Sequence, residues 1–209
     1  MKKLFLFLIC VCSISVVQAQ KTAITETGEE VILYSDGTWK LKNGETKAAV
    51  IAVNPKKFVK PVTSTFLLKS TKLNIGVWID SKTWTFKKAA SNEDAEYEFQ
   101  LKDGDLYGMM ITEKVEIPLE TLKEIALENG RAVSPDITIV KEEYRTVNNV
   151  KVLMLQMNGT IQGVKFTYFG YYYSNANGTV QFLTYTSQNL FATYKVKSED
   201  LLNGFVEIK

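Results

Sequence analysis

The sequence has no histidine, and its only two cysteines, Cys10 and Cys12, lie within the first 19 residues. We expect those residues to be removed as a signal peptide, so the remaining protein would have no imidazole, no thiol and no disulfide. Such a protein cannot use Ser–His or Cys–His catalytic pairs. It also has no histidine or cysteine ligand for zinc or copper. We therefore expect no metal site and no cofactor.

An excess of charge of one sign is missing as well. The chain has 25 basic and 23 acidic residues, and Lys2 and Lys3 would leave with the signal. A near-neutral surface of mixed signs provides no electrostatic footprint for nucleic acid. Beyond the first segment, no apolar run approaches the roughly 18 residues that span a bilayer. We expect neither a nucleic-acid partner nor a membrane span.

The first 19 residues have the pattern of a secretory signal peptide. Lys2 and Lys3 form a positive start, residues 4–17 are mostly apolar, and Ala19 supplies a small residue at the cleavage point. We expect cleavage near Ala19, which would make the protein periplasmic or secreted.

The rest of the chain predicts a small module, a linker and a main domain. Residues 20–43 are expected to form a β-hairpin module around the turn at 35–37. Residues 44–62 are typical of a linker, and their apolar patch at 48–53 is compatible with either a short strand or a docking segment. Residues 63–209 form the main domain.

Hydrophobic patterning of the main domain predicts an α+β fold. Strands are expected at 75–79, 95–102, 106–113, 137–146, 150–157, 162–173 and 179–186. The middle strands are apolar on both faces, which indicates an antiparallel sheet flanked by helices, in an α/β/α sandwich.

Two helices are expected in this domain. Pro118 suits the first position of the earlier helix, and Gly130 suits its C-cap. Its apolar stripe comprises Leu119, Leu122, Ile125 and Ala126. The later helix is expected at about 188–202, with Ser187 as its N-cap.

The element order from about residue 73 to 208 resembles the PsbP-like (Mog1/PsbP) superfamily. The likeness is carried by residues 144–152, residues 178–186 and the tail at 201–205. Residues 30–39, with their Asp36-Gly37-Thr38-Trp39, resemble short N-terminal modules of exported proteins from Bacteroidetes-type bacteria. The superfamily resemblance implies a binding or assembly protein without a shared catalytic motif, so no functional residue carries over from it.

One strand, at 166–173, is unusually rich in aromatic residues. Alternation along a strand places Tyr168, Gly170 and Tyr172 on the same face. Gly170 would leave a gap between the two rings, which a ligand or another backbone could approach. These three residues are our candidate binding site for a sugar or peptide. The alternative is that the rings fill the core.

Carboxylates offer the other candidate chemistry. Glu113 and Glu116 flank Lys114 at a strand end, where acid–base work would require them to be buried together. Glu142 and Glu143 are adjacent and are expected to point to opposite faces of their strand. We assign no catalytic residue.

The sequence favours an exported, non-catalytic binding or assembly-accessory protein, whose partner is another protein, a small molecule or a glycan. The alternative is a cell-envelope hydrolase that depends on carboxylates, which would need a buried carboxylate pair in a pocket. A stress-related envelope protein that binds another protein is a third class, and an exposed apolar patch would indicate it.

Overall fold

The computed structural model describes residues 21–25, 28–34, 39–42, 51–90 and 94–208. The chain divides into two compact units, Met1–Val50 and Ile51–Lys209. The expected signal peptide and the expected turn at 35–37 lie outside the described residues.

The first unit contains a small antiparallel sheet. Its strands are β1 (Lys21–Ile24), β2 (Glu30–Leu33) and β3 (Trp39–Leu41), in the order β1-β2-β3. Val31 and Leu41 pair across β2 and β3, and both are buried. Strand β1 was not expected from the sequence, so the hairpin is one part of a three-stranded sheet.

The second unit is built on an eight-stranded sheet, in the order β4-β10-β11-β12-β13-β9-β8-β7. Its strands are β4 (Val53–Phe58), β7 (Trp84–Lys88), β8 (Ala95–Leu101), β9 (Tyr107–Glu113), β10 (Thr138–Val147), β11 (Val150–Ile161), β12 (Val164–Asn175) and β13 (Gly178–Ser187). All neighbouring strands are antiparallel except β4 and β10, which are parallel.

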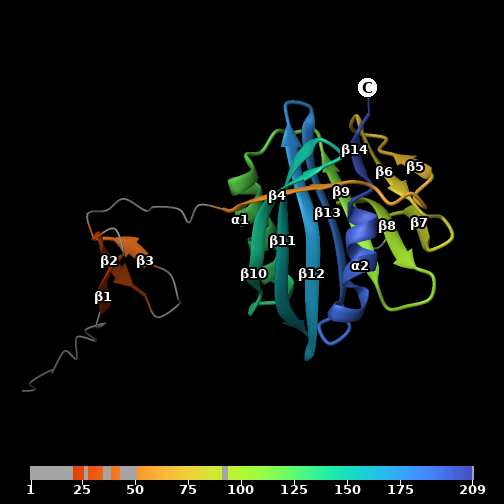
Figure 1. Ribbon diagram of the computed structural model, residues 1–209. Helices are drawn as coiled ribbons and strands as arrows, with labels where there is room; N and C mark the ends of the chain where they lie inside the picture. The colour runs from red at the N-terminus through yellow and green to blue at the C-terminus, as the bar shows by residue number, and fades with distance from the viewer. Residues whose placement is uncertain (1–20, 26–27, 35–38, 43–50, 91–93, 209) are drawn as a thin grey trace, which may run out of the picture. The chain divides into compact units, whose positions relative to one another are not determined.

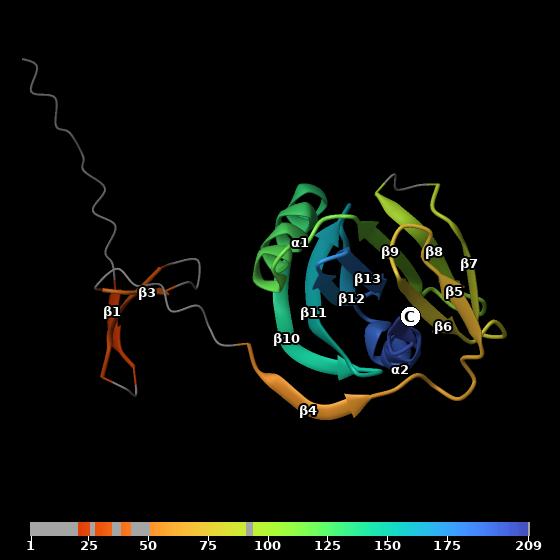
Figure 2. The same ribbon diagram turned by 90° about the horizontal axis from the view of Figure 1, so that it is seen from above.

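Different elements cover the two faces of this sheet (Figures 1 and 2). Helix α1 (Leu119–Val133) lies on one face. The other face is covered by helix α2 (Phe191–Leu202) together with a second sheet, in the order β14-β6-β5. The strands of that sheet are β5 (Phe66–Lys69), β6 (Ile75–Ile79) and β14 (Phe205–Glu207). The expected helix-flanked sandwich is therefore matched only in part, because sheet dominates one of the two outer layers.

Two apolar clusters stabilise these layers. The α2-side core includes Val77, Ile79, Met110, Phe182 and Phe205, all nearly inaccessible to solvent. The smaller α1-side core contains Leu122, Ala126, Ile137, Tyr144, Leu153, Leu155, Met157 and Tyr172. Such burial removes apolar surface from water and is the main source of stability in a chain of this kind.

Tight turns set the register of the long strands. Asn148 and Asn149, between β10 and β11, have φ values of 46° and 69°. Gln162 and Gly163, between β11 and β12, have φ values of 50° and 80°. Two consecutive positive φ values are the mark of a type I′ turn, in which Asn and Gly are favoured. The expected Asn148–Asn149 hairpin is confirmed, whereas Gln162 lies in a turn and not in the strand where we expected it.

Strand β4 lies inside the stretch that the sequence assigned to a linker. Its Phe58 is buried in the α2-side core, and the boundary between the compact units falls before residue 51. Pro55 has no backbone N–H, and it lies at the irregular point of the pairing with β10. An edge strand tolerates proline because the N–H groups on its outer side have no neighbouring strand to which they must donate.

Both helices differ from expectation at their ends. Pro118 is the N-cap of α1 and not its first residue, and α1 continues through Gly130 to Val133. A Cβ on Gly130 would lie 2.7 Å from Cδ1 of Ile137, so this glycine permits close packing and does not end the helix. Helix α2 begins at Phe191 after Leu190, because Ser187 is still part of β13.

Among the described residues, neither helix is long and apolar enough to cross a membrane.

Candidate functional site

Strand β12 divides its aromatic side chains between the two faces of the large sheet, as strict alternation predicts. Phe169, Tyr171 and Tyr173 belong to the α2-side core. Tyr172 belongs to the α1-side core, and Tyr168 packs against it. The two tyrosines singled out from the sequence therefore lie on the same face.

The structure places the three candidate residues in different environments. Tyr172 is 1% exposed, Gly170 is buried and Tyr168 is half-buried. A Cβ on Gly170 would lie 2.6 Å from Cβ of Leu183 and 3.0 Å from the carbonyl oxygen of Phe182. Leu183 thus occupies the space that Gly170 leaves. A role of the three residues in ligand binding stays a prediction.

Tyr168 belongs to a row of three tyrosines that crosses β12, β13 and β9. Tyr168 pairs with Tyr185, and Tyr185 pairs with Tyr107. The ring centroids are 5.9 Å apart in the first pair and 5.7 Å apart in the second. Tyr185 contacts both of the other rings, with interplanar angles of 39° to Tyr168 and 24° to Tyr107. Because the rings of Tyr168 and Tyr185 are tilted by 39° against each other, the row is not a flat platform for a sugar.

An apolar groove of about 480 Å³ lies beside this row, along the C-terminal half of α1. We call it the α1 groove. Strands β9, β12 and β13 provide most of its floor, and α1 provides a wall. Its lining residues are Asp94, Met109, Ile111, Ala126, Asn129, Gly130, Ala132, Val133, Ile137, Met157, Tyr168, Tyr172, Gln181 and Leu183. A concave, mostly apolar surface with a few polar groups is typical of a small-molecule site.

The sequence identified two of these lining residues, Tyr168 and Tyr172, and missed the others. One signal was available for Gln181, which interrupts the apolar run of β13 with an amide. Met109 and Ile111 carried no comparable signal, because apolar residues in a strand are more often core.

The carboxylates singled out from the sequence do not line this groove. Glu113 and Glu116 are exposed at the end of β9 and in the segment that follows it. Glu142 is 3.2 Å from Lys123 of α1, whereas Glu143 is 2.6 Å from Arg145 of the same strand. The prediction that Glu142 and Glu143 point to opposite faces is confirmed.

Asp80 and Asp200 line a separate, small cleft between β6 and α2, together with Lys197. Burial raises the pKa of Asp200, although Lys197 opposes the shift. Burial would also raise the pKa of Asp80, but hydrogen bonds from Lys82 and Thr83 outweigh it and lower that pKa. The cleft measures about 40 Å³, which is enough for a few water molecules and too small for a sugar.

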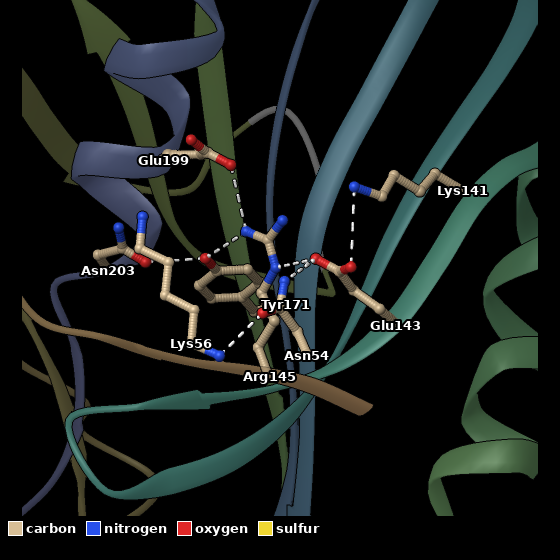
Figure 3. A network of polar contacts seen from close by, with 8 residues as sticks. All are labelled: Asn54, Lys56, Lys141, Glu143, Arg145, Tyr171, Glu199 and Asn203. Atoms are coloured by element: carbon tan, nitrogen blue, oxygen red, sulfur yellow. Dashed lines mark hydrogen bonds and ion pairs between the residues drawn. The ribbon is translucent and has the colours of Figure 1, made fainter. Parts of the chain in front are cut away.

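A polar network surrounds Arg145 on the other face of the sheet (Figure 3). The Arg145 side chain is 4% exposed. It donates hydrogen bonds to Glu143 at 2.6 Å, to the hydroxyl of Tyr171 at 3.1 Å and to Glu199 at 3.2 Å. It also lies over the ring of Phe58, with 4.4 Å from Cζ to the ring centroid.

The partners of Arg145 come from four elements, β4, β10, β12 and α2. Burial raises the pKa of Tyr171 to about 12, and its neutral hydroxyl donates to Asn203 at 2.8 Å. Asn54 of β4 donates to Glu143 at 3.1 Å. The network offers a buried cation with two carboxylate partners, so its chemistry is that of a structural tie.

Glu96 is a second buried charge, and both of its carboxylate oxygens accept hydrogen bonds. It accepts hydrogen bonds from the hydroxyls of Ser70 and Thr112, each at 2.6 Å, and from Thr71. Burial would raise the pKa of Glu96, but these hydrogen bonds hold it below its usual range. Within the part of the chain that the structure describes, no three His, Cys, Asp or Glu residues gather closely enough to hold a metal ion.

No protein family and no curated protein matches the sequence. Solved structures do resemble the fold. The PsbP protein (CyanoP) of Synechocystis sp. PCC 6803 superposes with a TM-score of 0.51 and 13% identity, over 70% of this chain and 94% of that one. A Pseudomonas aeruginosa protein of unknown function gives a TM-score of 0.43 and 10% identity, over 68% of this chain and 95% of that one.

A protein from Bacteroides thetaiotaomicron gives a TM-score of 0.45 and 11% identity, over 70% of this chain and 49% of that one. The similarity to the Synechocystis protein supports a PsbP-like fold for the second unit. At 13% identity it concerns the fold alone.

Proposed function

We propose that this chain is an exported, non-catalytic binding or assembly-accessory protein whose α1 groove takes up a small, largely apolar molecule. The observation that carries the proposal is the groove itself, about 480 Å³ in volume and within the range of known ligand sites. Its floor includes Met109 and Ile111, which are half-buried and present apolar surface to the groove.

The lining of the groove favours binding over the alternative of carboxylate-dependent hydrolysis. Glycoside hydrolysis ordinarily uses two carboxyl groups on either side of the scissile bond. Among the described lining residues Asp94 is the only carboxylate, and it is exposed at the rim. The described lining of the groove therefore supplies no second carboxylate for acid–base work.

Titration with N-phenyl-1-naphthylamine, an uncharged fluorescent probe of apolar sites, tests the proposal. We expect the wild-type protein to bind the probe, and Ile111→Lys to weaken its binding about tenfold, because a charge in an apolar groove must be desolvated. Val196→Lys is the matched control, since Val196 is 65% exposed on α2 and remote from the groove lining.

Two results would contradict the proposal. One is a wild-type protein that gives no saturable fluorescence increase. The other is an Ile111→Lys variant that binds the probe as tightly as Val196→Lys does. Thermal melts of both variants establish that each is folded.

Export rests on the pattern of residues 1–19. We expect N-terminal sequencing of material recovered outside the cytoplasm to begin near Gln20. A mature chain that retains Cys10 or Cys12 would be inconsistent with cleavage near Ala19.

A further inference from the structure

Two polar side chains at the floor of the α1 groove are more than nine-tenths buried and form no side-chain hydrogen bond with the described residues. They are Tyr172, which is 1% exposed, and Gln181, which is 7% exposed. They are direct neighbours in the register of β12 and β13. The enclosed unpaired side-chain atoms of the described residues are Glu142 Oε2 and Ser198 Oγ, so the polar atoms of Tyr172 and Gln181 are not sealed off from solvent. They keep contact with the groove, where water or a ligand can pair with them, as nearly all polar groups at buried positions are paired.

We propose that the α1 groove binds an uncharged, largely apolar molecule that carries a hydroxyl or carbonyl group, and that Gln181 and Tyr172 hold this group. The inference rests on the proposed function and specifies its ligand. A glutamine amide offers both a donor and an acceptor, and a tyrosine hydroxyl does the same. Burial raises the pKa of Tyr172, which keeps its hydroxyl protonated and able to donate.

The surroundings of the two groups favour a neutral ligand over an ion. Leu183, Met109 and Ile111 line the floor beside them, and Gln181 pairs with Ile111 in the register of β13 and β9. A carboxylate or ammonium placed here would lose its hydration without gaining a counter-charge, which costs several kcal/mol per ion. Among the lining residues that the structure describes, Asp94 alone is charged, and its exposure leaves it screened by solvent.

The apolar walls account for the rest of the ligand. Val133 of α1, together with Ile137 and Met157, adds apolar side chains to the lining of the groove. Contact with these side chains favours a hydrocarbon body, since each buried methylene group contributes about 0.8 kcal/mol. The two polar groups would fix the orientation of that body, as the few polar groups of small-molecule sites commonly do.

Competition against N-phenyl-1-naphthylamine tests the inference with three probes of equal chain length at pH 7.5. The probes are octan-1-ol, octanoate and octylammonium. We expect octan-1-ol to displace the fluorescent probe at a concentration about tenfold lower than either ion does, because only the alcohol enters without the desolvation of a charge. Equal displacement by octanoate or octylammonium would overturn the inference.

Two variants show whether the named residues hold the hydroxyl. Gln181→Leu and Tyr172→Phe should each weaken the competition by octan-1-ol about fivefold to tenfold, once the measured affinity of each variant for the fluorescent probe is taken into account. Gln100→Leu on β8, outside the α1 groove, is the matched control and should change neither. Unaltered competition by octan-1-ol in both groove variants would overturn the assignment.

Stability supplies an independent measurement. Replacing an unpaired buried amide by an apolar side chain should leave the melting temperature of the free protein unchanged or raise it. A Gln181→Leu variant that melts markedly lower would show that the amide has a structural partner and would overturn the inference. If the wild-type protein fails to bind the fluorescent probe at all, the proposed function itself fails. The two failures are therefore distinguishable.

Discussion

Replacing Arg145 with alanine is expected to lower the free energy of unfolding by about 3–5 kcal/mol, the usual cost of removing one partner from a buried ion pair. The change leaves Glu143, 13% exposed, and Glu199, 27% exposed, without their shared cation. It also removes the guanidinium that lies over Phe58 and joins β4 to the rest of the sheet. Denaturant melts at neutral pH measure the effect.

Lys141→Ala is the matched control for this experiment. Its ammonium is 3.7 Å from the same carboxylate of Glu143, but the Lys141 side chain is 51% exposed. An exposed pair of this kind contributes at most about 1 kcal/mol. Similar losses from Arg145→Ala and Lys141→Ala would show that the buried network is not a structural tie.

The Arg145→Ala loss should also depend on pH. Burial would raise the pKa of Glu143, but hydrogen bonds from Arg145 and Asn54 lower it below the ordinary value of 4.5. A carboxyl whose pKa is lower in the folded state stabilises the protein above its unfolded pKa, and this stabilisation is lost as pH falls through the folded pKa. The difference in the free energy of unfolding between the wild-type protein and Arg145→Ala should therefore become smaller as pH falls below about 4.5.

Leu122→Ala is expected to cost about 2–5 kcal/mol, because it removes a fully buried side chain from the α1-side core and leaves a cavity. Ile125 belongs to the same sequence stripe but is only half-buried and lies outside that core. Ile125→Ala should therefore cost clearly less, and the exposed Glu124→Ala should fall within about 0.5 kcal/mol. Equal losses at Leu122 and Ile125 in denaturant melts would contradict the orientation of α1.

The central strands and the existence of both helices were predictable from the sequence because their signals are local. Asn148 and Asn149 suit the positive φ values of a hairpin turn. Leu122 and Ala126 follow the helical period and are both buried. Where the turn residues and the spacing of the apolar residues indicate the same helix or strand, it can be assigned without knowledge of contacts that are distant in sequence.

The short strands were missed because tertiary pairing, and not local pattern, makes them strands. Strand β4 contains Pro55 and two lysines, and its exposed residues do not alternate regularly with buried ones. Strand β14 spans only three residues, from Phe205 to Glu207, and exists through its pairing with β6. The second sheet replaces part of the expected helical layer, and of its three strands the sequence predicted only β6.

The candidate site was predictable only in fragments. Alternation placed Tyr168 and Tyr172 on the correct common face, but it could not show that Leu183 fills the space beside Gly170. The α1 groove requires β9, β13 and α1 to come together, and these elements are separated in sequence. Residues such as Ile111 and Gln181 become neighbours only through the pairing of β13 with β9.

The parallel pairing of β4 with β10 has a consequence for the order in which the chain is completed during synthesis. Asn54 hydrogen-bonds to Glu143, which lies 89 residues further along the chain. Strand β4 is synthesised first among the strands of the large sheet, and it cannot pair there until its neighbour β10 has been synthesised. Strands β10, β11 and β12 instead each pair with their immediate successor. Strands β10 to β13 can pair with one another soon after each is synthesised. Strand β4 stays unpaired until the long stretch of chain between β4 and β10 has formed a loop.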